Sequence, residues 1–298
     1  MMAKEKKLEI GAINITIQPH TPDMYLKLFR EVYKLKTPIK VSGDQFAIIA
    51  SIHKLERGQV EPGPITGDFY RYTAIDPEAP WFDLKTGDFA DGSLLDEINI
   101  PENLKPNGAR FSYIFYPKEH LLFYESYYDS KTFGAMSAER FVRNLLNQPS
   151  ILGKYGKIDV THIPSKDKLN DALKMPTKEV IELIITRPNG DTLGKTQKRV
   201  MDRMNALNVE TYEESYKAVQ GRSIDVDINL KTMAKIAASN GKVSIKGKDS
   251  NSKPITFSTT EHPLKKKQYF DPNVQDAFSV LIELSSKLKD EIVKWFRS

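Results

Sequence analysis

Two runs of alternating apolar residues around a short turn constrain the fold of this chain more than any other feature. Phe111–Phe115 and Leu121–Tyr127 enclose Pro117-Lys118-Glu119-His120. This pattern is typical of a β-hairpin, because strand residues alternate between two faces and proline with polar residues favours a turn. Residues 13–17 repeat the same period of two, with isoleucine at every second position. The first half of the chain is therefore predicted to form an antiparallel sheet.

Two helices are expected beside this sheet. Thr21-Pro22-Asp23 has the residue types of a helix start, and a second helix is predicted from Ser137 to the residues before Pro149. Residues 76–108 are rich in proline, glycine and aspartate. We expect them to form a long ordered loop that lies over the sheet and is anchored by Trp81 and Phe82.

An aromatic cluster accompanies the predicted hairpin. Aromatic side chains can stack on nucleic-acid bases, but alternation across a hairpin is also what the core of a sheet requires, and we favour the core. The cluster consists of Tyr113, Phe115, Tyr116, Phe123, Tyr124, Tyr127 and Tyr128.

The second half is predicted to begin near Gly153-Lys154-Tyr155-Gly156. Beyond it the pattern predicts strands at 157–163, 178–187 and 209–218, with helices at 166–173 and 194–207. The nearly continuous apolar run 180–185 is typical of a central strand covered on both faces. A helix capped by Asn229, strands at 242–248 and 254–260, and a long helix over 272–296 complete the prediction.

The expected fold class is therefore α+β. It comprises two mixed, mainly antiparallel sheet subdomains with flanking helices, residues 1–152 and 153–298, and a long C-terminal helix. Val274, Leu281, Leu288 and Trp295 are spaced seven apart in that helix, and Ser285 interrupts the apolar stripe. Docking on the core is the favoured interpretation, with a homodimer or higher homo-oligomer as the alternative.

Composition narrows the class of protein. The chain has no cysteine, which excludes a thiol nucleophile and a zinc site built from thiolates and fits a reducing compartment. No run approaches the roughly 18 apolar residues of a membrane span, and the charged N-terminus leads into a strand pattern. We expect a soluble cytoplasmic protein that does not itself span a membrane.

Positive charge is concentrated in one segment. The chain carries a formal net charge of +5, and residues 229–270 alone hold nine lysines against two acidic residues. A basic block in a folded protein is typical of a polyanion-binding surface. We predict phosphate contacts from Lys231, Lys235, Lys242, Lys246, Lys248, Lys253, Lys265, Lys266 and Lys267, and second-tier contacts from Lys195, Lys198, Arg199 and Arg203.

The character of this block indicates how it binds. Lys242, Lys246 and Lys248 fall on one face of a predicted strand, with Val243 and Ile245 on the other. The segment contains no arginine, the residue that reads guanine edges with two hydrogen bonds, so backbone contact is favoured over sequence readout. The alternative is a solvated edge strand, on which lysine discourages aggregation.

Three enzyme motifs are incomplete. Residues 190–196 resemble a phosphate-binding loop but place three residues between their glycines, where the Walker pattern needs four. Asp225 and Asp227 point the same way along a predicted strand and could hold a metal, but no Glu-x-Lys accompanies them. His120 and His162 lack a Ser or Asp at a telling spacing, and we expect them to be partly buried. No catalytic residue, metal site or cofactor is predicted.

Two resemblances complement these patterns. Segments 11–15, 67–72, 75–82 and 110–125 resemble a bacterial family known only as a domain of unknown function, whose members tend to lie near phage-defence genes. The segment 243–257, its following basic loop and the closing helix are similar to RexA-like phage-exclusion proteins. The second resemblance implies a dimeric DNA-binding sensor in anti-phage defence that signals to a partner protein.

The expected function is non-catalytic, largely sequence-independent binding of nucleic acid, with double-stranded DNA as the favoured ligand. Two alternatives stay open at this point. The basic face could meet an acidic partner protein in a defence complex, or the protein could be a metal-dependent effector nuclease that uses Asp225 and Asp227.

Overall fold

The larger of two main sheets contains the predicted hairpin. The computed structural model describes residues 5–18, 21–95, 100–187 and 195–297. The main path of the first sheet runs β11-β1-β9-β8-β5-β3-β2, with β16 also on β1, β10 on β9 and β4 on β5. The bounds are β1 (Lys6–Thr16), β2 (Ile39–Ser42), β3 (Gln45–Ile49), β4 (His53–Lys54), β5 (Ile65–Thr73), β8 (Ala109–Tyr116), β9 (Leu121–Tyr128), β10 (Lys131–Thr132), β11 (Asp159–His162) and β16 (Lys266–Phe270).

The hairpin prediction is confirmed. Strands β8 and β9 pair antiparallel with Tyr113 opposite Tyr124 and Tyr116 opposite Leu121. Five members of the aromatic cluster are at most 6% exposed, and Tyr127 and Tyr128 are half-buried. The cluster is therefore sheet core, as the alternation indicated.

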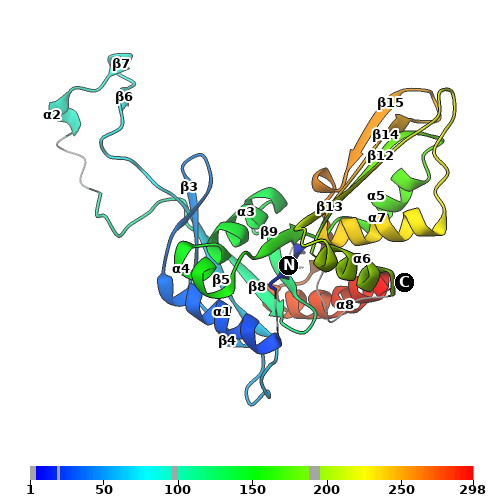
Figure 1. Ribbon diagram of the computed structural model, residues 1–298. Coiled ribbons are helices and arrows are strands. Elements are labelled where there is room, and N and C mark those ends of the chain that lie inside the picture. The colour runs from blue at the N-terminus through cyan, green and yellow to red at the C-terminus, as the bar shows by residue number, and fades with distance from the viewer. Residues whose placement is uncertain (1–4, 19–20, 96–99, 188–194, 298) are drawn as a thin grey trace.

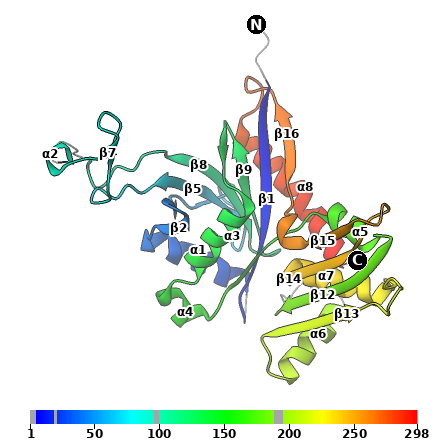
Figure 2. The same ribbon diagram turned by 90° about the horizontal axis from the view of Figure 1, so that it is seen from above.

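Helices α1 (Pro22–Leu35), α3 (Ala135–Leu146) and α4 (Pro149–Tyr155) cover one face of this sheet (Figures 1 and 2). The hydroxyl of Thr21 accepts a hydrogen bond from the backbone N–H of Met24, so the predicted start of α1 is confirmed. Phe29 of α1 stacks on Phe115 of β8 with ring centroids 4.5 Å apart. These aromatic contacts fix the helix against the sheet.

The second sheet has the strand order β13 (Thr211–Lys217), β12 (Thr177–Thr186), β14 (Gly241–Lys248) and β15 (Pro254–Ser258). Its helices are α5 (Lys166–Leu173), α6 (Lys195–Ala206) and α7 (Ile228–Asn240). The prediction of a doubly covered strand at 178–187 is wrong. Ile181, Leu183 and Ile185 are buried, whereas the residues between them are half-buried, because α7 packs on one face only.

Helix α8 (Ala277–Arg297) docks on the first sheet, in agreement with the favoured interpretation. Leu281, Leu288 and Trp295 are at most 4% exposed. Ser285, which interrupts the apolar stripe, is fully buried, and its hydroxyl lies 3.0 Å from the Tyr116 hydroxyl of β8. The helix begins five residues later than predicted, and Val274 is 84% exposed before it.

One apolar core joins the two sheets, and the fold is α+β. Leu8 and Ile10 of the first sheet share a buried cluster with Ile181 and Val243 of the second and with α8. Strands β11 and β16 lie beyond the predicted boundary near Gly153, yet both pair with β1. That boundary therefore does not follow the sheets, and the division into two subdomains stays a prediction. In the described part of the chain, no helix is both long enough and apolar enough to cross a membrane.

Residues 76–95 do not lie over the sheet. They form an arm with a small hairpin, β6 (Phe82–Asp83) and β7 (Asp88–Phe89), and the short helix α2 (Gly92–Leu95). The arm projects away from both sheets in both views (Figures 1 and 2). Phe82 is 61% exposed and therefore anchors nothing, and Trp81 donates its indole N–H to the carbonyl of Pro77 within the arm itself.

A buried carboxyl lies within the first sheet. Glu125 of β9 is 3% exposed and accepts a hydrogen bond of 3.0 Å from the backbone N–H of Ser112 on β8. Asp68 of β5 accepts a bond from the Ser112 hydroxyl. Burial raises the pKa of Glu125 to about 7, and the neighbouring Asp68 charge adds to the rise, against the Ser112 bond and the Arg110 charge.

We predict that Glu125→Gln stabilises the protein at pH 8 and not at pH 5. The folded state holds a proton on Glu125 that the unfolded state releases near pH 4.5, so the free energy of unfolding falls as the pH rises from there to about 7. Between pH 5 and pH 8 this loss of unfolding free energy amounts to roughly 2 to 3 kcal/mol. Urea unfolding of the variant and of the exposed-site control Glu78→Gln tests this; equal pH dependence in both variants contradicts the assignment.

Candidate nucleic-acid interface

Five exposed lysines from three separate segments line one groove. The groove consists of two adjoining hollows, of about 610 Å³ and about 380 Å³, between the start of α5, residues 261–266 and the C-terminal half of α8. The lysines are Lys166 and Lys168 of α5, Lys265 and Lys266 before and in β16, and Lys294 of α8. We call this feature the basic groove.

The groove combines charge with an apolar wall. Trp295 and Ile292 of α8 and Leu264 line the smaller hollow, while Leu264 and Leu288 also reach the larger one. Three carboxylates, Asp167, Glu261 and Glu291, border the hollows as well. Within the described residues, none of the five lysines has an acidic side chain inside the 4.0 Å ion-pair distance. Their charges are therefore available to a ligand.

Two predicted contact residues add to the positive charge near the basic groove. Lys231 and Lys235 lie one turn apart on α7, where like charges repel. Burial, followed by the charges of Lys231 and Lys166, lowers the pKa of Lys235. The α7 lysines therefore belong electrostatically with Lys166 and the groove, and a bound phosphate would relieve their repulsion.

The other lysines of the basic block lie elsewhere. The predicted strand face is confirmed, since Val243 and Ile245 of β14 are buried. Lys246 is exposed on the open face of the second sheet, and Lys253 is exposed in the turn that follows. Lys248 pairs with Glu179 at 3.2 Å, and Lys267 lies 3.9 Å from Glu9 on the opposite face of β16 from Lys266.

The second-tier residues follow α6. Lys198, Arg199 and Arg203 are exposed, and the Arg203 guanidinium lies 5.9 Å from the centre of the Tyr212 ring. The side chain of Lys195 and the glycine-rich residues 190–194 lie outside the described residues. Most of the incomplete phosphate-loop motif at 190–196 therefore lies outside them as well.

Sequence reasoning missed Lys166, Lys168 and Lys294. They are separated by many residues from the basic block, so a charge count along the chain does not group them with it. The available signal was the predicted strand–helix junction at 163–166. Without the pairing of β11 and β16 on β1, nothing indicated that α5 would meet residues 261–266.

The structure places the two residues of the nuclease alternative differently from the prediction. Asp225 and Asp227 are not in a strand, and the Asp227 carboxylate accepts the Leu230 backbone N–H at 2.7 Å. Asp227, and not Asn229, is thus the N-cap of α7. Within the described ranges, no three His, Asp or Glu side chains are grouped as metal ligands.

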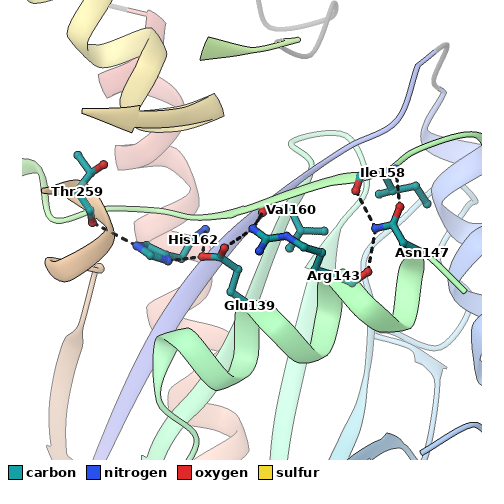
Figure 3. A network of polar contacts seen from close by, with 7 residues as sticks. All are labelled: Glu139, Arg143, Asn147, Ile158, Val160, His162 and Thr259. Carbon is teal, nitrogen blue, oxygen red and sulfur yellow. Dashed lines mark hydrogen bonds and ion pairs between the residues drawn. The ribbon is translucent and has the colours of Figure 1, made fainter. Parts of the chain in front are cut away.

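A second polar site, drawn in Figure 3, fastens α3 to β11. Glu139 and Arg143 of α3 and its C-cap Asn147 are spaced four apart. They contact His162, Val160 and Ile158, which are spaced two apart on β11 and just before it. Four helical residues rise about 6 Å and two strand residues about 6.6 Å, so the two periods match. The Arg143 guanidinium donates to the Val160 carbonyl at 2.7 Å, and Asn147 exchanges two 2.9 Å bonds with the backbone of Ile158.

His162 connects these contacts between α3 and β11 to the second sheet. Its side chain is 3% exposed, so the expected partial burial is wrong. Its Nδ1 bonds the Glu139 carboxylate, and its Nε2 lies 3.2 Å from the carbonyl of Thr259, just after β15 (Figure 3). The ring therefore contacts an acceptor at each of its two nitrogens. The Glu139–His162 contact is therefore a buried polar pair that links α3, β11 and the residue after β15.

The charges around Glu139 are balanced within a small cavity. Burial raises the pKa of Glu139, but the His162 hydrogen bond and the charges of His162 and Arg143 outweigh it and hold the pKa below its ordinary value. Lys242, one of the predicted contact residues, borders the same 230 Å³ cavity together with Asp159. Because Glu139, Arg143 and His162 already contact protein partners, we interpret this site as structural.

We predict that Glu139→Ala lowers the free energy of unfolding at pH 7 by about 2 kcal/mol, because it leaves the buried His162 ring and the Arg143 side chain without the carboxylate that they contact. The contribution of the Glu139 carboxylate is present at neutral pH and is lost as the pH falls through its lowered pKa. Chemical denaturation checks this against Glu283→Ala, which removes only an exposed i,i+4 pair with Lys287 and should change the free energy of unfolding far less. Equal losses in the two variants would mean that the buried pair has no special role.

Comparison with known proteins places the chain in a family. Residues 6–286 match the domain of unknown function DUF4747, so the chain belongs to that family. The match spans both halves and is not confined to the N-terminal segments that carried the resemblance. No curated protein matches the chain.

Proposed function

We propose that this protein binds the phosphate backbone of nucleic acid, with double-stranded DNA as the favoured ligand, along the basic groove. The observation that carries the proposal is the convergence of five exposed lysines, without ion-pair partners among the described residues, on one concave surface. Lysine is a point-charge phosphate ligand, so this surface favours contact with the backbone over reading of bases.

We propose binding without chemistry on the nucleic acid. The two carboxylates of the nuclease alternative lie outside any strand, and one of them caps a helix. The resemblance to RexA-like proteins would place backbone binding in anti-phage defence, as the sensing part of an exclusion system. That assignment rests on the resemblance alone and stays a prediction.

We predict that Lys166→Gln, Lys265→Gln and Lys266→Gln together weaken binding to random-sequence duplex DNA by at least about tenfold at about 0.1 M salt. The slope of log K against log salt is negative, and each lost phosphate contact reduces its magnitude by about 0.9. The three substitutions together should therefore reduce that magnitude by about 2.7. Fluorescence anisotropy over a salt series, with and without magnesium, measures both quantities. The DNA should remain intact in every sample.

The matched control removes the same number of charges away from the groove, at Lys246, Lys253 and Lys267. It should leave the salt slope unchanged, because Lys246 lies on the open face of the second sheet, Lys253 lies in the turn between β14 and β15, and Lys267 faces Glu9. Loss of binding in the control alone would move the interface to the open sheet. Absence of binding by the unmodified protein at low salt would exclude nucleic acid, and magnesium-dependent cleavage would establish the nuclease alternative.

A further inference from the structure

The projecting arm has two chemically different faces. Phe82 and Phe89 lie directly opposite each other in the β6–β7 hairpin, and so do Asp83 and Asp88 on its other face. Phe82 is 61%, Leu84 90% and Phe89 70% exposed. One end of a folded protein thus presents an apolar pair to water, beside a pair of like charges that destabilises the hairpin unless a cation approaches it.

The charge of the arm is the opposite of that of the groove. Residues 76–95 contain five acidic residues and one lysine. The basic groove has lysines at its rim and an apolar wall formed by Trp295, Leu264 and Leu288. A hairpin with an aromatic face and an acidic face matches such a surface in both respects, since burial of the rings is favourable and the carboxylates meet ammonium groups.

The arm does not lie near the groove of its own chain. Both views place β6, β7 and α2 at one end of the molecule, and α5 with the C-terminal end of α8 at the other (Figures 1 and 2). Only a second molecule can bring the two surfaces together. A reciprocal exchange, in which each chain inserts its arm into the other's groove, closes a symmetric dimer with two identical contacts.

We infer that the arm of a second copy of this chain occupies the basic groove through Phe82 and Phe89 against its apolar wall and through Asp83 and Asp88 against its lysines. The arm then takes the place of nucleic acid, so dimer formation and nucleic-acid binding exclude each other. This competition rests on the proposed function, whereas the dimer contact itself does not.

The contact is tested on the unmodified chain by zero-length carbodiimide cross-linking of a mixture of ¹⁴N- and ¹⁵N-labelled protein. The expected products are mixed-isotope peptides that join Asp83 or Asp88 to Lys166, Lys265 or Lys266, detected by mass spectrometry. Sedimentation should show a dimer whose dissociation increases with salt. A monomer at every concentration, or a dimer without any of these cross-links, overturns the inference.

Paired variants separate the arm from the rest of the surface. Phe82→Ser with Phe89→Ser should raise the dimer dissociation constant at least tenfold, whereas Val60→Ser with Val219→Ser, which alter other exposed apolar residues, should leave it unchanged. Random-sequence duplex DNA should abolish the cross-links. If the cross-links form but DNA neither binds nor competes, the dimer contact stands and the proposed function fails; if DNA binds and the arm variant dimerises normally, the arm inference fails alone.

Discussion

The structure depends on the pairing of strand β1. One edge of β1 pairs with β9, and the other is shared by two strands from far along the chain: β16 along residues 6–10 and β11 along residues 13–16. In the sequence, β11 precedes the strands of the second sheet and β16 follows them. The chain therefore leaves the first sheet at β11 and returns to it at β16, both on this edge of β1. The shared apolar core and the His162–Thr259 bond then hold the two sheets together.

The basic groove follows from the same arrangement. Helix α5 begins shortly after β11, residues 261–266 precede and enter β16, and α8 lies across the first sheet beside them. Lysines that are distant in the sequence therefore converge without forming any continuous pattern in the chain. Their mutual repulsion is tolerated because their side chains are exposed, and a polyanion or an acidic segment that binds there would relieve it.

Local patterns in the sequence predicted most of the secondary structure, since strand and helix periods are local properties. The 166–173 helix and the 111–127 hairpin were predicted correctly for that reason. The failures have long-range causes. The apolar run at 180–185 predicts a doubly covered strand, and this prediction is wrong because apolar content cannot show that one sheet face lacks a covering layer.

The projecting arm and the Glu139–His162 pair could not be predicted for related reasons. Composition identified residues 76–108 as irregular but could not show which way they project. Glu139 and His162 lie in separate elements, and their contact depends on the tertiary fold. Of the predicted contact residues in the basic block, Lys265 and Lys266 line the groove. Lys231 and Lys235 lie on α7, where the charge of Lys166 reaches Lys235, and Lys242, Lys246, Lys248, Lys253 and Lys267 do not line the groove.

Hydrogen–deuterium exchange of the protein with and without random-sequence duplex DNA tests the central claim, that the groove is the binding surface, most directly. We expect slower exchange at the start of α5, in residues 261–270 and in the C-terminal half of α8, with no change in the β14–β15 hairpin. Protection confined to that hairpin, or no protection at a DNA concentration that saturates binding, would contradict the claim.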